Sequence, residues 1–390
     1  MSKVLFHSLT IPPDNVSTGQ LVADIAVGLK LEGKQIEILA SSPQYNFDSD
    51  IYDNGSLEKL GKHLYASDYN GVKIYHIRSS RRSFNQKKRF LQWMSFHIRS
   101  IIFLYKNRHN YETIFIFSYP PTMNLVAILS KKLFRMKTIY SVWELYPEIA
   151  QKLNELNSKL LLSLFKKIDN YCLKIIDEIV VNSNELKLYL TKERKINENK
   201  INVIYHFSNS LSSKKPEKFS NHIIYTGNLG KPQNIKSFVE KLNKSKIPFK
   251  LTIYGSGSEY ENISNFRSES IEVNPYTIRS QIIEETKEAP FALVSLSSEI
   301  TVEGFPGKTF DYLKMNKILI GYSNPKSGLA KFIKEYNLGI NIDPSIQNID
   351  EELKKLDNKD SLEKFYINIK KVNDEIANIK AVAQSYSDLI

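Results

Sequence analysis

The sequence contains almost no cysteine and no long apolar run. Cys172 is the only cysteine among 390 residues, which excludes a disulfide framework or a cysteine-based metal site within one chain. We interpret Cys172 as part of the hydrophobic core, where cysteine behaves as a small apolar residue. No apolar run approaches the roughly 20 residues that cross a bilayer, and the first residues predict a strand instead of a signal peptide. These absences lead us to expect a cytoplasmic protein.

Acidic residues are fewer than basic ones. The 54 Lys and Arg against 42 Asp and Glu give a net charge of +12, which indicates an anionic partner: nucleic acid, a membrane surface or a phosphorylated ligand. An RNA-binding glycine–aromatic signature and a cysteine–histidine finger are both missing, so we expect no nucleic-acid partner. The acidic Asp48-Ser49-Asp50 triplet lies in a polar loop with no strand before it. We interpret it as a solvated loop and not as a metal site.

The shortage of acids is greatest between Arg78 and Arg108, where every charged residue is Lys or Arg. A basic lead-in there precedes an aromatic-rich helical pattern over residues 90–104, and this combination is typical of a segment that docks on anionic lipid. The alternative is a core helix with a solvated basic lead-in, and the sequence supports both interpretations equally. The membrane-facing candidates are Arg81, Arg82, Lys87, Lys88 and Arg89.

Strand and helix patterns alternate through the first half of the chain. A strand over Lys3–Ser8 is followed by a long loop ending at Gly19, a helix from near Gln20, and a strand over Ile36–Ala40. This rhythm predicts a doubly wound parallel sheet, whose ligands bind beyond the carboxyl ends of its strands. We interpret Gly19 as ligand-facing, because the loop is too long for a bare connection. A turn glycine before a helix is the alternative.

Two acids follow another predicted strand, which covers Thr138–Val142. The segment after it reads Trp-Glu-Leu-Tyr-Pro-Glu, so Glu144 or Glu148 could hydrogen-bond an acceptor hydroxyl or take its proton. The alternative is that these acids only suit the start of a helix. A single long helix is then predicted over Leu153–Ile176.

The second half restarts the alternation after a serine-rich linker. A strand over Ile223–Thr226 ends in Gly227-Asn228-Leu229-Gly230-Lys231, and one over Phe249–Tyr254 ends in Gly255-Ser256-Gly257. Glycines let the backbone approach a ligand closely, and Lys231 can face a phosphate. With its composition of 42% hydrophobic and 25% charged residues, the chain is long enough for two α/β domains.

The stretch from Ser297 to Ser323 reads as strand, loop, helix and strand. Backbone N–H groups of its loop and the charge of Lys308 favour an anion. Glu303 and Asp311 bracket that loop, and carboxylates bind hydroxyl groups well. The stretch therefore predicts a site for a phosphate and a polyhydroxyl group together, as a sugar nucleotide requires. The alternative is an ordinary connection with a solvated acid at each end.

As an ordered set, these motifs resemble the GT-B glycosyltransferases, specifically retaining family 4 of bacterial polysaccharide, O-antigen and capsule enzymes. Glu303 to Asp311 is similar to the family's Glu, seven residues, Glu motif, and Pro306-Gly307-Lys308 to the Pro-x-Lys loop of one branch. The resemblance covers nearly the whole chain and implies an α/β fold of two Rossmann-like, doubly wound domains facing a cleft. It implies an acceptor domain over 1–207, a linker over 208–220, a nucleotide-sugar domain over 221–365, and a C-terminal helix over 366–390 that packs back on the first domain.

The resemblance also implies roles for individual residues. It implies a hexosyltransferase that retains anomeric configuration, without a metal or other cofactor, with Glu303, Lys308 and Glu144 as catalytic residues. The nucleotide-diphosphate sugar would be bound by Gly227, Asn228, Lys231, Gly255, Gly257, Phe305, Pro306, Gly307, Lys308, Thr309 and Asp311. A lipid-linked saccharide acceptor, at the inner face of the plasma membrane, would be bound by Gly19, Gln20, Glu144 and Glu148.

Two other functions fit the same resemblance. One is a sugar-nucleotide epimerase, which would act on the nucleotide sugar alone. The other is a catalytically silent subunit that assists a partner transferase. This second alternative rests on Asn228 and Gln233, which stand where many family members have Arg and Lys.

Overall fold

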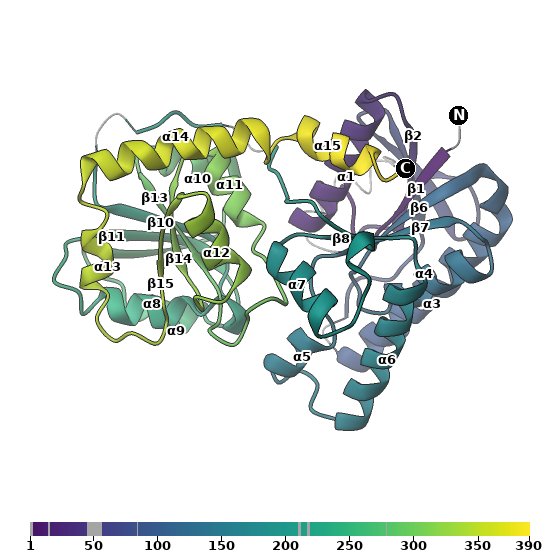
Figure 1. Cartoon of the computed structure of the whole chain (residues 1–390), viewed down its shortest axis with the longest axis horizontal. Coiled ribbons are helices and arrows are strands. Elements are labelled where there is room, and N and C mark those ends of the chain that lie inside the picture. Colours follow the sequence, from purple (N-terminus) through teal and green to yellow (C-terminus); the bar gives the residue numbers. More distant parts are fainter. Residues whose placement is uncertain are drawn as a thin grey trace. The chain divides into compact units, whose positions relative to one another are not determined.

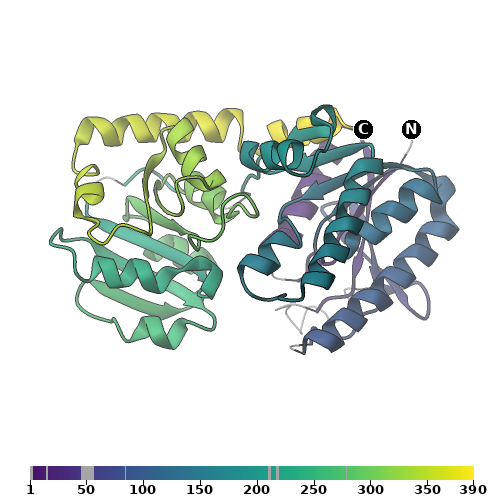
Figure 2. The same cartoon turned by 60° about the horizontal axis from the view of Figure 1, so that its bottom comes forward.

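The computed structural model describes residues 3–14, 16–44, 57–83, 85–209, 212–216, 219–277 and 279–390. The Asp48-Ser49-Asp50 triplet lies outside these ranges. The chain forms two compact units, coloured along the sequence in Figure 1 and turned in Figure 2. The first unit comprises Met1–Pro147, Leu156–His206 and Ile379–Ile390, and the second comprises Glu148–Glu155 and Phe207–Asn378.

The first unit is built on a sheet whose strands, within the described residues, follow the order β3-β4-β5-β2-β1-β6-β7-β8-β9. Its strands are β1 (Lys3–His7), β2 (Gln35–Ser41), β3 (Glu58–Lys59), β4 (Leu64–Tyr69), β5 (Val72–Ile77), β6 (Tyr111–Phe117), β7 (Lys137–Val142), β8 (Glu178–Val181) and β9 (Ile201–Val203). From β5 to β9 all neighbours are parallel, whereas β3, β4 and β5 pair antiparallel. Asn70 and Gly71 join β4 to β5 with φ of 50° and 78°, as a tight hairpin turn requires.

Helices cover both faces of this sheet. They are α1 (Ser17–Leu31), α3 (Gln86–Asn107), α4 (Met123–Lys132), α6 (Lys159–Ile175), α7 (Asn184–Lys192) and α15 (Ile379–Ser387). The chain moves along the sheet in one direction from β1 to β2 and in the other from β6 to β9. Because crossover connections are right-handed, α1 lies on the face opposite α4 and α6. α15 packs against α1, where a Cβ on Gly28 would lie 2.9 Å from that of Ala383.

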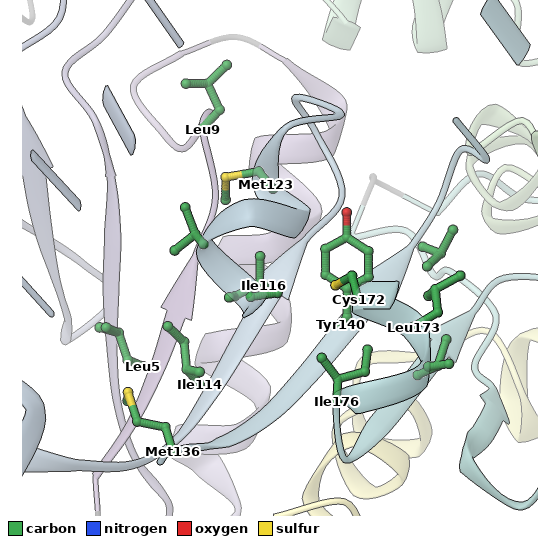
Figure 3. Close-up of a cluster of buried hydrophobic side chains, with 14 of the residues drawn as sticks. Leu5, Leu9, Ile114, Ile116, Met123, Met136, Tyr140, Cys172, Leu173 and Ile176 are labelled. Carbon is green, nitrogen blue, oxygen red and sulfur yellow. The ribbon is translucent and has the colours of Figure 1, made fainter. Parts of the chain in front are cut away.

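One core cluster of the first unit lies between its sheet and helices α3, α4, α6 and α7. Figure 3 shows Leu5 of β1 beside Ile114 of β6 and, in the same cluster, Cys172 of α6 beside Tyr140 of β7. Cys172 is fully buried in this cluster, as its sequence context predicts, and burial raises the pKa of its thiol. In the described part of the chain, no helix has the length and apolar character needed to cross a membrane.

The second unit is a parallel sheet with the described strands in the order β12-β11-β10-β13-β14-β15. The strands are β10 (His222–Asn228), β11 (Lys250–Ser256), β12 (Ile271–Pro275), β13 (Phe291–Ser295), β14 (Ile318–Tyr322) and β15 (Gly339–Ile342). The helices are α5 (Glu148–Lys152), α8 (Ile235–Leu242), α9 (Tyr260–Ser264), α10 (Arg279–Glu285), α11 (Lys308–Lys314), α12 (Gly328–Glu335), α13 (Asp350–Lys354) and α14 (Lys359–Glu375). The prediction of two doubly wound α/β units is therefore confirmed.

One helix prediction differs from the structure. The single helix predicted over Leu153–Ile176 is wrong, because α5 ends at Lys152 and a turn with Asn154 at φ 56° follows. Ser158 then caps α6 by accepting a hydrogen bond of 3.4 Å from the backbone N–H of Leu161, and this local capping outweighs the continuous apolar pattern. The C-terminal segment contains two helices, α14 in the second unit and α15 in the first.

Candidate functional site

The chain reverses its direction along the second sheet between β10 and β13, which are neighbours at its centre. Beyond the carboxyl ends of the central strands lie the glycine turns after β10 and β11 and the loop from Leu296 to Gly307 after β13. Gly227 and Gly255 pair in register at the ends of β10 and β11. Such a reversal point is where doubly wound sheets bind their ligands.

The three predicted donor-site glycines at or just after the ends of β10 and β11 serve two different purposes. A Cβ on Gly255 would lie 2.5 Å from the carbonyl oxygen of Gly227, and one on Gly257 would lie 2.6 Å from that of Leu229. These two glycines are therefore required by the close packing of the turns. Gly227 has φ of 124°, and a Cβ there would lie 3.1 Å from Nζ of Lys308. Its missing side chain leaves space beside that ammonium group.

Lys308 places a cation beside Gly227, at the carboxyl end of β10. It begins α11, and its Nζ donates a hydrogen bond of 3.1 Å to the carbonyl oxygen of Thr226. The same nitrogen lies 3.9 Å from the centre of the Tyr225 ring. Burial lowers the pKa of Lys308 to about 7, although the nearby Asp311 carboxylate acts in the opposite direction. An anion that reached Nζ would stabilise the charged form and offset this cost of burial.

The turn after β10 is held by its own polar side chains. Oε1 of Gln233 accepts hydrogen bonds from the backbone N–H of Gly230 at 3.1 Å and from Nδ2 of Asn228 at 3.3 Å. Asn228 and Gln233 thus fix the shape of the turn. Lys231, in the same turn, is exposed.

Glu303 is buried and fully engaged. Its Oε1 lies 2.8 Å from Nζ of Lys152, and its Oε2 accepts backbone hydrogen bonds from Thr301 at 2.9 Å and Val302 at 3.1 Å. Burial alone would raise the pKa of Glu303, but the hydrogen bonds from Lys152 and Thr301 together hold it below its usual value. Lys152 also donates to Oγ1 of Thr301 at 3.0 Å, so one ion pair fixes the start of the loop.

Asp311 lies one turn into α11 and keeps part of its surface exposed. Its Oδ1 accepts a hydrogen bond of 2.5 Å from the hydroxyl of Ser208. The neighbouring Thr309 is completely buried, and its Oγ1 has no hydrogen-bond partner among the described residues. A carboxylate and a spare hydroxyl thus stand in the same helix as Lys308.

Aromatic packing holds the loop between Glu303 and α11. The Phe305 ring lies 5.7 Å from that of Phe310 in a stacked arrangement and 5.4 Å from that of Phe332 in an edge arrangement. Phe305 is therefore an anchor beneath the loop. Pro306 and Gly307, which follow it, retain more exposed surface.

The candidates near α1 have structural partners in the first unit. α1 begins at Ser17, so Gly19 lies within the helix and not in the loop predicted before it. A Cβ on Gly19 would lie 2.9 Å from the backbone nitrogen of Ile11, so packing alone explains this glycine. Gln20 donates through Nε2 to Asp24 at 3.0 Å and also contacts the hydroxyl of Tyr69. The acceptor-binding roles of Gly19 and Gln20 stay predictions.

The two acids after β7 have different surroundings. Glu144 is exposed and belongs to the first unit, whereas Glu148 begins α5 in the second unit and is buried. The basic candidates Arg81, Arg82, Lys87 and Lys88 are exposed, and Arg89 is half-buried with its guanidinium carbon 5.5 Å from the centre of the Trp93 ring.

Sequence reasoning missed several polar residues at this site. Lys152 pairs with Glu303 across 151 positions of sequence, and no local pattern signals such a pair. The hydroxyl of Tyr312 accepts a hydrogen bond of 2.8 Å from the backbone N–H of Thr226 and so ties α11 to β10. In the part of the chain that is described, no group of three or more His, Cys, Asp or Glu side chains could hold a metal ion.

Comparison with known proteins gives a likeness of fold. No protein-family model and no curated protein matches this sequence. Among solved structures, sucrose-phosphate synthase from Thermosynechococcus elongatus matches with a TM-score of 0.74 at 12% identity, over 100% of this chain and 98% of the other. Anabaena HepE in complex with UDP and glucose matches at 0.68 and 11%, over 100% and 99%. The lipopolysaccharide outer core galactosyltransferase WaaB matches at 0.65 and 13%, over 99% and 98%. These proteins are GT-B glycosyltransferases, and the chain described here has the GT-B fold.

Proposed function

We propose that this chain is a glycosyltransferase that moves a sugar from a nucleotide-diphosphate donor to a saccharide acceptor. The observation that carries the proposal is Nζ of Lys308, held at the reversal point of the second sheet beside the missing side chain of Gly227. A partly desolvated ammonium attracts an anion more strongly than one in water, because the local dielectric constant is lower. HepE, which has the same fold, was also solved in complex with UDP-glucose, and that supports a nucleotide sugar as the ligand.

The donor would be recognised by three groups with separate tasks. Lys308 and the backbone N–H groups of residues 307–309 would bind the diphosphate, and Asp311 would accept hydrogen bonds from ribose hydroxyls. The ion pair of Glu303 and Lys152 would contact the donor sugar. Positive charge held where negative charge develops on the leaving diphosphate stabilises the transition state, and this is usually the largest catalytic effect.

The finer features of the reaction belong to the same proposal. We assign a hexosyl transfer with retained anomeric configuration and without a metal, because Lys308 can supply the charge that a metal would supply. We assign a lipid-linked saccharide of polysaccharide synthesis as acceptor, bound in the first unit with Glu144 as the candidate base. The net charge of +12 favours association with an anionic membrane surface, and it supports the proposal that the enzyme acts at the cytoplasmic face of the membrane.

A silent subunit is the second candidate, and one contact favours it. Asn228 and Gln233 bond to each other at 3.3 Å and bring no charge to the diphosphate. Such a subunit would bind the nucleotide without turning over. An epimerase would instead change the nucleotide sugar with no acceptor present, so analysis of products with and without acceptor separates all three functions.

The direct test is a thermal-shift screen of UDP, GDP, CMP and dTDP without added metal, on the native chain and on Lys308→Met. A ligand at about 100 times its dissociation constant adds about 2.7 kcal/mol of stability. We expect one nucleotide to stabilise the native chain and to have no effect on Lys308→Met. Lys370→Met, which removes an exposed lysine of α14, should respond like the native chain. Stabilisation of Lys308→Met by the same nucleotide would refute the site.

A further inference from the structure

Helix α3 has a stripe of exposed apolar side chains along its solvent side. Leu91 and Ile98 are 66% and 60% exposed, and Ile102 and Tyr105 follow as exposed residues. Their spacings of seven, four and three residues place all four on one side of a helix. The opposite side of α3 enters the core through Phe96, Phe103 and Leu104. α3 is therefore a core helix on one side and an uncovered apolar surface on the other.

Helix α6 repeats this arrangement. Leu160 is 79% exposed, and Leu161, Leu164 and Tyr171 are also exposed. Cys172 and Leu173 of the same helix are buried in the core cluster. Leucines at successive exposed positions of a helix are costly to leave in water, because removing apolar surface from water is favourable.

The two exposed stripes share one side of the first unit. α3, α4 and α6 all contribute buried residues to the same core cluster, and Figures 1 and 2 show them side by side. The solvent-facing sides of α3, α4 and α6 therefore all point away from the same face of the sheet. The exposed Leu133, just after α4, belongs to this side too. Helices that follow parallel strands begin at the carboxyl edge of the sheet, so Leu91 and Leu160 both lie near that edge.

The charge of these helices has one sign. α3 contains no acid, and neither does α4. The single acid of α6, Asp169, is buried and pairs with Arg194 at 3.4 Å. The cations of the three helices are Lys87, Lys88, Arg89, Arg99, Lys106, Lys131, Lys132, Lys159, Lys166, Lys167 and Lys174. Lys131 pairs with Asp177, just after α6, at 2.6 Å. No exposed acid on the three helices themselves neutralises the positive charges that surround the apolar stripes.

We propose that the outer side of α3, α4 and α6, called the docking face, binds the surface of an anionic lipid bilayer. An anionic bilayer has an apolar layer that can bury the exposed leucines and anionic headgroups that can pair with the lysines. A nucleic acid would satisfy the charges and leave the leucines in water. The proposal deepens the membrane location given in the proposed function, by naming the surface that makes the contact, and it does not depend on the donor site. It places the bilayer contact on three helices, of which only α3 lies in the basic segment identified from the sequence.

Vesicle flotation of the full chain tests the docking face without any nucleotide. We expect binding to vesicles of phosphatidylcholine mixed with phosphatidylglycerol and none to phosphatidylcholine alone. The variant Leu91→Ser/Leu160→Ser/Leu164→Ser should bind the mixed vesicles at least about tenfold more weakly, because it removes inserted apolar surface. Lys87→Gln/Lys88→Gln/Lys159→Gln should lose about fivefold per lysine, the effect of about 1 kcal/mol for each cation near the surface.

The control variant is Leu31→Ser/Ile367→Ser. These residues are 78% and 61% exposed. Leu31 lies on α1, on the opposite face of the first sheet, and Ile367 lies on α14 of the second unit. This variant should float like the native chain. No flotation of the native chain, an equal loss in the control, or full binding by the leucine variant would overturn the proposal. Dimerisation that depends on the same leucines, without vesicle binding, would assign the face to a second copy instead. Because Lys308→Met should float normally, failure here and failure of the donor site are distinguishable.

Discussion

The carboxyl edges of the two sheets carry different electrostatics on the same architecture. At the edge of the second sheet, Glu303 is held ionised by Lys152, and Lys308 keeps a pKa of about 7. At the edge of the first sheet, His7 ends β1 and His97 bonds to the hydroxyl of Thr122 at 2.7 Å. Burial lowers their pKa values to about 4 and about 3.

In the proposed function, this difference assigns the two edges to two kinds of ligand. A charged edge suits a diphosphate, whose binding needs a cation and whose departure needs charge stabilisation. The edge of the first sheet combines buried neutral imidazoles with the exposed carboxylate of Glu144, the candidate base for a saccharide acceptor. The sheets position both sets of groups equally well, so the side chains at the strand ends decide the chemistry.

Removal of Lys308 is expected to have the largest effect on the charged edge. Lys308→Met should reduce turnover by about 100-fold or more, as loss of a group that stabilises developing charge does. The same change should raise the melting temperature by about 2–4 °C, the shift given by about 1 kcal/mol in a domain of this size, because a desolvated charge disappears. Kinetics and a melting curve measure both.

The matched control for Lys308 is Lys317, a second buried lysine among the described residues of the second unit. Its Nζ donates to the carbonyl oxygens of Thr286, Lys287 and Ala289 at 2.9, 2.8 and 2.7 Å. Lys317→Met should lower the melting temperature, because three buried acceptors lose their donor, and should leave nucleotide affinity unchanged. If Lys308→Met and Lys317→Met changed the melting temperature and the nucleotide affinity in the same way, the assignment of Lys308 to the diphosphate would be contradicted.

Lowering the pH should destabilise the first unit, because the buried histidines at the carboxyl edge of its sheet are neutral in the folded chain. Because the folded pKa of His97 lies below that of an unfolded histidine, the unfolded chain binds more protons, and stability falls as pH drops from about 6.5 towards 3. The expected cost is about 3–5 kcal/mol for each such histidine. His97→Gln should flatten the dependence of melting temperature on pH, whereas His109→Gln, at an exposed position, should leave it as it is.

Breaking the ion pair at the start of the donor loop should cost less than the acid effect as a whole. Lys152→Ala leaves the Glu303 carboxylate buried without its cation, which typically destabilises by about 3–5 kcal/mol. Chemical denaturation measures this cost. The double variant Lys152→Met/Glu303→Gln should recover most of the stability without recovering turnover. A single variant as stable as the native chain would show that the pair does not hold the loop.

The smallest effect is expected at Asp311. Asp311→Asn should weaken nucleotide binding about tenfold, because a charged acceptor becomes a neutral one, with a change in stability below about 1 kcal/mol. The amide oxygen can still accept the hydrogen bond from Ser208. Calorimetric titration with the nucleotide found by thermal shift gives the affinity, and an unchanged value would exclude contact with the ribose.

The sequence predicts those features that depend on neighbouring residues. Apolar runs separated by glycine turns predict the parallel strands, and the segment from Glu303 to Asp311 predicts a loop and a helix because its parts are adjacent in sequence. The break at Asn154 escaped prediction, since the apolar pattern continues through it. The pairing of Lys152 with Glu303 could not be predicted either, because it depends on how distant segments pack. The Asn70-Gly71 hairpin had a local signal that could have been used.

The central claim is that protonated Lys308 binds the donor diphosphate, and the pH dependence of nucleotide affinity tests it most directly. Below pH 7 the amine is already protonated, so affinity should be constant with respect to this group; above pH 7 the dissociation constant should rise about tenfold per pH unit until the pKa of the bound state is reached. Lys308→Met should bind weakly and show no such rise. Identical pH profiles for the native chain and Lys308→Met would contradict the claim.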